Sequence, residues 1–143
     1  MLKRITPYIT FTDGKCAEAL EFYKKVLKAE VMIDKKGQVE LMHFAGSPME
    51  TPENKHLIMH GHIKIGASEI MVSDTTQSDQ IKVGTNLTLC LDNFKSKTEM
   101  DVVFTELSAG GMVIMPLEKQ FWNAYFGLLM DKFGIQWMFH MEL

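Results

Sequence analysis

Apolar and polar residues alternate along several segments of the chain, and this period-two pattern predicts β-strands. A helical spacing of three and four residues interrupts the alternation twice, over residues 15–28 and between Ser96 and Gly110. Each half of the chain therefore follows the order βαβββ, in which the short strands 31–33 and 39–44 of the first half form one strand pair. The predicted strands cover residues 6–11, 31–33, 39–44, 56–65 and 69–73 in the first half, and 85–91, 113–117, 125–130 and 136–141 in the second.

The two halves look like copies of one small module. Residues 5–11 lead through Asp13 into the first predicted helix, where Asp13 is the expected N-cap, and residues 85–91 lead through Asp92 into the second. A module of about 70 residues buries too little surface to be stable alone, so we expect the copies to share a core or a cleft. The predicted organisation is a single domain over 1–143. Module 1 covers about 4–74, a polar linker 75–82, and module 2 about 83–143.

Composition excludes several classes of function. The chain has 143 residues, 46% of them hydrophobic, and a net charge of -3 without a basic stripe, which argues against nucleic-acid binding. No apolar run reaches the roughly 20 residues that span a bilayer, and the N-terminal segment lacks a signal-peptide pattern. We therefore expect a cytoplasmic protein without a membrane partner. Its two cysteines, Cys16 and Cys90, are expected to be reduced, and Cys16 is expected to be a packing residue.

Strand parity divides the side chains between two faces of each predicted sheet, because successive residues point to opposite sides. The apolar face is expected to meet the helix. The other face collects polar and sulfur-containing side chains, and these are the candidates for lining a cavity. They include Tyr8 and Thr10; His60, His62 and Lys64; Met71 and Ser73; Asn86, Thr88 and Cys90; Met138 and His140.

Three motifs in order resemble the PhnB-like branch of the vicinal oxygen chelate superfamily, which includes glyoxalases, extradiol dioxygenases and bleomycin-resistance proteins. They are PYITF with EALEFYKKVLKAEV (residues 7–11 and 18–31), HGHIKIGASEIMVSD (60–74) and FWNAYFGLLMDKFGIQWM (121–138). The resemblance covers nearly the whole chain. It implies an α+β fold of two βαβββ modules whose mixed sheet curls around a cavity, commonly in a homodimer.

The resemblance also implies where a metal would bind. Metal-dependent relatives hold one divalent ion with His, Gln or Glu residues at four strand positions, which align here with Thr6, Met71, Asn86 and Met138. Thioethers, a hydroxyl and a lone amide are poor ligands for hard divalent ions. The aligned positions therefore predict a protein without a resident metal or other cofactor.

Two alternatives to a metal-free binding protein stay open. His60 and His62 project together from one strand, a spacing that suits zinc if His140 approaches, although polar lining is the more common role of such a pair. His60 also suits proton transfer, because a histidine titrates near neutral pH. Trp122, in an aromatic run after a loop, is expected either to stack on a ligand or to lock the modules or a partner subunit together.

The sequence thus predicts a metal-free, small-molecule-binding protein. The alternatives are a metal-dependent lyase or dioxygenase of the glyoxalase type and a metal-free acid–base enzyme that uses His60. Members of this branch often carry a demethylubiquinone methyltransferase label, but no glycine-rich cofactor loop follows the first predicted strand. The predicted binding residues are His60, His62, Met71, Ser73, Thr88, Trp122, Met138 and His140.

Overall fold

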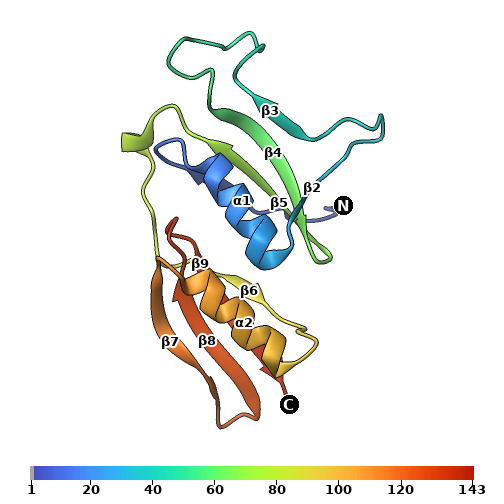
Figure 1. Ribbon diagram of the computed structural model, residues 1–143, viewed down its shortest axis with the longest axis vertical. Coiled ribbons are helices and arrows are strands. Elements are labelled where there is room, and N and C mark those ends of the chain that lie inside the picture. Colours follow the sequence, from blue (N-terminus) through green and yellow to red (C-terminus); the bar gives the residue numbers. More distant parts are fainter. Residues whose placement is uncertain (1) are drawn as a thin grey trace. The chain divides into compact units, whose positions relative to one another are not determined.

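The computed structural model describes residues 2–143, which form two compact units that meet in sequence between Lys82 and Val83 (Figure 1). Each unit combines one α-helix with one sheet. In residues 2–143 no helix is long and apolar enough to cross a membrane. The first unit contains β1 (Tyr8–Phe11), α1 (Cys16–Leu27), β2 (Glu30–Val31), β3 (Leu41–His43), β4 (Ile58–Ile65), β5 (Ser68–Asp74) and a short 3₁₀ helix, η1 (Ser78–Gln80). The second contains β6 (Leu89–Leu91), α2 (Lys97–Ser108), β7 (Met112–Lys119), β8 (Ala124–Met130) and β9 (Gln136–Glu142).

Both sheets have the same topology. The first has the order β1-β5-β4-β2, with β3 also paired to β4, and the second has the order β6-β9-β8-β7. In each sheet the strand before the helix pairs in parallel with the last strand, and the other pairs are antiparallel. The prediction of an α+β fold with mixed sheets is therefore confirmed. The sheets are two separate sheets that do not close into a barrel.

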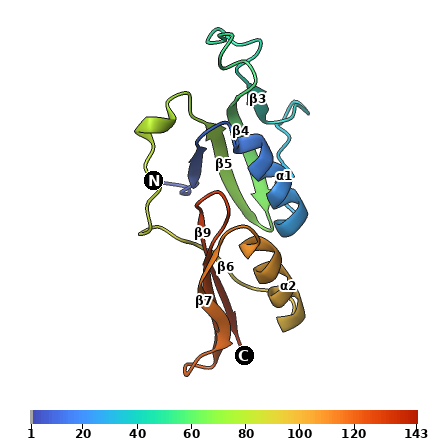
Figure 2. The same cartoon turned by 60° about the vertical axis from the view of Figure 1, so that its left-hand side comes forward.

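Each helix covers one face of its own sheet. In the first unit α1 lies against β4 and β5, as both views show (Figures 1 and 2). Its apolar residues Leu20, Tyr23 and Val26 are buried, as are Ile63 and Val72 of the sheet. Burial of such an amphipathic face supplies most of the stability of a short helix.

In the second unit α2 buries Phe104 edge-on against Phe139, with the ring centroids 5.0 Å apart. Gly127 of β8 makes this close approach possible, because a Cβ there would lie 2.8 Å from the Phe104 ring. The sheet and helix of this unit therefore pack at a distance that only glycine allows.

The sheet registers correct the predicted match between the two halves. Tyr8 lies opposite Met71 in the first sheet, and Cys90 lies opposite Met138 in the second. Met71 and Met138 hold the same place in the last strands of the two modules, so Tyr8 corresponds to Cys90. Thr6, two residues earlier, then corresponds to Thr88. The sequence comparison matched residues 5–11 with 85–91, so it was out of register by two residues.

The predicted strand over 85–91 is also too long. Only Leu89–Leu91 forms a strand, and Leu87 is 79% exposed rather than packed on the helix. The cause is a local set of hydrogen bonds, since the buried Gln136 amide donates to the Thr85 carbonyl and to the Thr88 hydroxyl. These residues therefore form a bend that is held from β9.

The predicted helix cap at Asp13 is wrong. The N-cap of α1 is Lys15, without a side-chain cap, because Asp13 and Gly14 both take left-handed conformations, with φ of 56° and 68°, and turn the chain before the helix starts. Asp74, at the end of β5, replaces the cap. Its buried carboxylate accepts hydrogen bonds from the backbone N–H of Cys16 and of Ile58, both at 2.9 Å. One side chain thus ties β5 to the first turn of α1 and to the start of β4.

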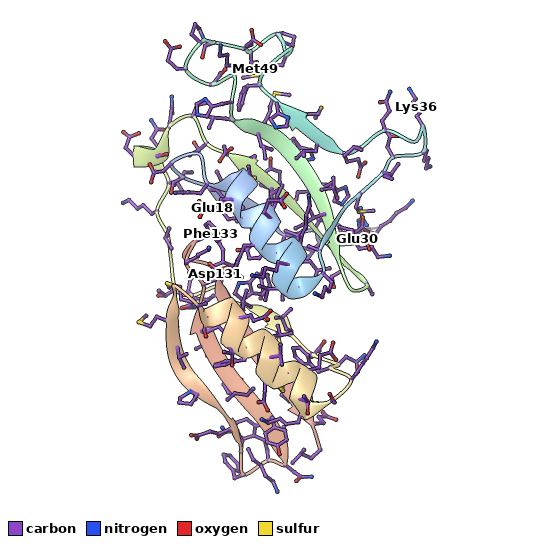
Figure 3. All side chains as sticks on the ribbon, in the orientation of Figure 1. Glu18, Glu30, Lys36, Met49, Asp131 and Phe133 are labelled. Atoms are coloured by element: carbon purple, nitrogen blue, oxygen red, sulfur yellow. The ribbon has the colours of Figure 1, made fainter. Side chains whose placement is uncertain are left out.

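In the second unit α2 lies between Ser96 and Gly110, as the helical spacing predicts. The Ser96 hydroxyl accepts from the Glu99 N–H at 3.1 Å, in the Ser-x-x-Glu pattern of a capping box. A second buried carboxylate, Asp131, organises the turn between β8 and β9, where Asp131 and Phe133 are labelled in Figure 3. It accepts from the Phe133 and Ile135 N–H groups and from the Trp137 indole N–H. Trp137 is therefore a structural residue.

Replacing Asp74 with alanine should destabilise the protein strongly. The change leaves two buried backbone N–H groups without an acceptor, and each such loss costs about 1 to 3 kcal/mol. We expect the free energy of unfolding, measured by chemical denaturation, to fall by about 2 to 5 kcal/mol. Asp79→Ala is the matched control, because Asp79 is exposed in η1. Equal midpoints for the two variants would contradict the role given to Asp74.

Candidate functional site

The candidate site lies on the face of the first sheet that α1 does not cover. The register places Tyr8 opposite Met71 and Met71 opposite His62, so these three side chains form one row across β1, β5 and β4. A second row starts with Thr10 opposite Ser73 and ends with His60 opposite Met42. Ser73 and His60 follow directly from the Val72–Gly61 pair, so they are neighbours on this face. The sheet therefore brings together four of the predicted binding residues: His60, His62, Met71 and Ser73.

Buried His62 lies between two carboxylates. Its Nδ1 is 2.8 Å from a Glu40 oxygen and its Nε2 is 3.1 Å from a Glu69 oxygen, although the second contact is not aligned as a hydrogen bond. Glu69 also forms an ion pair with Arg4. Each carboxylate therefore has a partner within the protein, and both ring nitrogens of His62 face acidic oxygens.

A further charged row lies beyond His62 on the same face. Lys64 is opposite Glu69 in β5 and opposite Glu30 in β2, so acidic residues flank it on both sides. Glu30 is labelled in Figure 3. The charged residues of this face therefore gather at one end, and the other end carries His60 with neutral neighbours.

His60 has a different environment from His62. Its Nδ1 lies 3.3 Å from the Tyr8 hydroxyl, and the two rings are 5.7 Å apart at an interplanar angle of 36°. Tyr8 reaches across β5 to make this contact, since β1 and β4 flank β5 on opposite sides. Tyr8 and Met42 are each 49% exposed, so this end of the face has accessible aromatic and thioether surface. It can offer hydrogen bonds and soft apolar contacts to a small molecule.

The other predicted binding residues belong to the second unit. Met138 lies between Cys90 and Leu128, and His140 lies opposite Phe126, on the sheet face away from α2. This face is mostly apolar, unlike the corresponding face of the first sheet. Thr88 is already bound, because its hydroxyl accepts from Gln136 at 3.2 Å.

Trp122 lies in the turn between β7 and β8. It is 47% exposed and packs edge-on against Phe121 and Phe126, with centroid distances of 4.9 and 6.0 Å. Phe121 is 96% exposed. The turn therefore presents an aromatic surface, and its role in ligand stacking or in assembly stays a prediction.

The two thiols are poorly suited to nucleophilic chemistry. Cys16 is fully buried, and burial, with a smaller contribution from the Asp74 charge, raises its pKa to about 12. Cys90 is exposed, but partial burial and then Asp92 raise its pKa as well. Since the thiolate is the reactive form, neither cysteine gains reactivity from its surroundings.

The residues at the family's metal positions do not fit a hard divalent ion. The corrected register replaces Asn86 with Thr88, so the four positions become Thr6, Met71, Thr88 and Met138, which hold no carboxylate or imidazole. Within residues 2–143 no three His, Cys, Asp or Glu side chains form a group that could hold a metal. His140 belongs to the second unit, whereas His60 and His62 belong to the first.

Parity alone identified the candidate face but missed the partners that organise it. It placed Tyr8 on the face without linking it to His60, because the parallel pairing of β1 with β5 joins distant parts of the chain. It gave no sign of Glu40, which lies just before a very short strand, or of the Arg4–Glu69 pair. The sequence signal for the site is the i, i+2 spacing of His60 and His62, and the structure places these two side chains in different environments.

Comparison with known proteins now identifies the family. A family model described as 3-demethylubiquinone-9 3-methyltransferase matches residues 3–139. The chain belongs to this family. It is 30% identical over 143 residues to the protein YjdN of Escherichia coli, an alignment that covers 96% of this chain and 94% of that protein.

Solved structures agree with this assignment. Protein PA1353 from Pseudomonas aeruginosa superposes with a TM-score of 0.82 at 31% identity, covering 99% of this chain and 98% of that one. A PhnB protein from Bacillus cereus, described as a putative 3-demethylubiquinone-9 3-methyltransferase, gives a TM-score of 0.79 at 24% identity, with coverage of 97% and 99%. A glyoxalase/bleomycin resistance protein/dioxygenase family enzyme from Burkholderia phytofirmans shares the fold, with a TM-score of 0.62 at 14% identity over 95% and 97% of the chains. The predicted resemblance to the PhnB-like branch of the vicinal oxygen chelate superfamily is confirmed.

Proposed function

We propose that this protein binds a small, uncharged organic molecule on the sheet face that carries His60, without the help of a metal. The observation that supports this most strongly is the separation of charges on that face. Glu69 forms an ion pair with Arg4, and Glu40 lies 2.8 Å from His62 Nδ1, so both carboxylates already have partners within the protein. The remaining groups near His60 are neutral hydrogen-bonding side chains and thioethers.

The shape of these side chains favours a planar ring. Met42 and Met71 are polarisable and adaptable, and thioethers make favourable contacts with aromatic rings. Tyr8 adds an accessible aromatic surface beside them. A single-ring compound with one polar substituent would use both the apolar surface and the imidazole of His60.

The enzyme alternatives differ in how well this geometry supports them. A metal-dependent lyase or dioxygenase needs ligands that Thr6, Met71, Thr88 and Met138 do not supply. The metal-free acid–base alternative has one favourable observation, the contact between the Tyr8 hydroxyl and His60 Nδ1. Binding of an uncharged molecule at His60 is the step that this reaction would share with a pure binding function.

The methyl transfer in the family's name is not part of the proposal. The connection from β1 to α1, residues 12–15, contains one glycine, Gly14, and so lacks the glycine-rich loop of dinucleotide-type cofactor sites.

We also propose that the two units form one domain and that the protein is a cytoplasmic homodimer. The exposed aromatic residues Phe121 and Trp122 support a subunit contact, because large exposed apolar groups commonly mark interfaces.

Removal of the His60 side chain should abolish most of the binding. The probes are acetophenone and phenol as uncharged rings, with benzoate and benzylamine as charged rings of similar size. We expect only the uncharged probes to shift the NMR signals of His60 and its neighbours. His60→Ala should lower the affinity for these probes about tenfold, which corresponds to the loss of one hydrogen bond. His43→Ala, on the exposed edge of β3, is the control and should bind normally. Stronger binding of benzoate or benzylamine than of the uncharged probes would contradict the proposal.

The purified, untagged protein should contain no stoichiometric divalent metal after dialysis. The physical reason is the absence of hard ligands at the four family positions. Elemental analysis measures this directly. One zinc, nickel or iron per chain that is lost in His60→Ala would assign the histidine pair to a metal site and overturn the metal-free proposal.

A further inference from the structure

The contact between Tyr8 and His60 restricts the chemistry that His60 can offer. Among the described residues, the Tyr8 hydroxyl is the hydrogen-bond partner found for His60, at 3.3 Å from Nδ1. Within residues 2–143 no ion pair joins a carboxylate to His60, whereas carboxylates face both ring nitrogens of His62 two residues away. The partner of His60 Nδ1 is therefore an uncharged hydroxyl.

A neutral imidazole carries its single proton on one nitrogen and accepts a hydrogen bond at the other. A phenol hydroxyl is a good donor and an unprotonated ring nitrogen is a good acceptor, so donation from Tyr8 to Nδ1 is the favourable direction. The proton of His60 then resides on Nε2. The partner of one ring nitrogen thus fixes the role of the other.

We propose that Tyr8 is a positioning residue that holds His60 in the tautomer with the proton on Nε2, and that the site takes an uncharged ring compound bearing a carbonyl oxygen. The part concerning the ligand rests on the proposed function. An Nε2–H group is a donor, so the ligand atom that meets it must be an acceptor. A carbonyl oxygen accepts without carrying charge.

The surroundings oppose the charged competitors. A carboxylate ligand would find the basic groups of this face already engaged, since Arg4 contacts Glu69 and His62 contacts Glu40. An ammonium ligand has donors only and cannot accept from Nε2–H. Met42 of β3 and Met71 of β5, on the two strands that flank β4, then favour an aromatic substituent next to the carbonyl group.

The tautomer is tested by ¹⁵N NMR of the histidine side chains in the full chain, because the two ring nitrogens give different shifts when protonated and unprotonated. The wild type should show a protonated Nε2 and an unprotonated Nδ1 at His60. Tyr8→Phe keeps the ring but removes the hydroxyl, so it should move the Nδ1 signal towards that of a mixture of tautomers. Tyr125→Phe is the control, since Lys97 Nζ lies over the ring of Tyr125 and the substitution keeps that ring. Identical His60 signals in the wild type and Tyr8→Phe would overturn the positioning role.

The ligand class is tested with a matched pair of probes, acetophenone and α-methylstyrene, in which a CH₂ group replaces the carbonyl oxygen. The wild type should bind acetophenone about tenfold more tightly. Tyr8→Phe should reduce this preference to about twofold or less, while Tyr125→Phe keeps it. Equal binding of the two probes by the wild type would overturn the carbonyl assignment.

The two measurements separate the failure of this inference from that of the proposed function. If no ring probe binds at His60, the proposed function and the ligand class are both wrong, and the ¹⁵N signals still decide the role of Tyr8. If the probes bind but Tyr8→Phe leaves the preference for acetophenone unchanged, the proposed function stands and this inference is wrong.

Discussion

The contacts of His62 are the constraint on which the candidate site depends. A half-buried pair of carboxylates on a sheet face would be costly without basic partners, and it would dominate whatever that face binds. Arg4 contacts one oxygen of Glu69 and His62 lies beside the other, and Glu40 contacts His62 from the segment before β3. Two backbone hydrogen bonds also hold His62 beside this segment. The His62 N–H donates to the Glu40 carbonyl, and the His62 carbonyl accepts from the Met32 N–H. His62 therefore joins β4 to residues 32–40 and pairs with the carboxylates that lie on the same face as His60.

On the helix side of the first sheet, a buried carboxylate has a comparable structural task. Asp74 satisfies backbone N–H groups of α1 and β4, and in the second unit Asp131 does the same for a turn and for the indole of Trp137. Such groups are tolerated in a core because each oxygen accepts hydrogen bonds from fixed donors. The apolar packing under each helix and the polar arrangement on the opposite face are thus held by separate sets of interactions.

Much of this fold could be predicted from local patterns. Helical spacing located α1 to within one residue at either end, and alternation found β4, β5, β8 and β9 closely. The start of α2 after Ser96 could be predicted because the hydrogen bond that caps it joins residues only three positions apart. The cap expected at Asp13 failed because a residue of β5, distant in sequence, satisfies the helix instead.

The candidate site was only partly predictable for the same reason. Period-two alternation assigns a side chain to a face, which is how His60, His62, Met71 and Ser73 were found. It cannot say which strands are neighbours, and the Tyr8–His60 contact depends on the order β1-β5-β4. Nor can it separate two histidines on one strand into a structural residue and a binding residue, because their partners come from other segments.

A double-mutant cycle between Glu40 and His62 tests the central claim most directly. Glu40→Gln, His62→Gln and the double variant are compared with the wild type by chemical denaturation. If the pair organises this face, the two changes should be coupled by about 1 to 3 kcal/mol, with the double variant more stable than the sum of the single effects predicts. Effects that add to within about 0.5 kcal/mol would show that the 2.8 Å contact carries no such interaction, and the account of a self-paired charged row would be wrong.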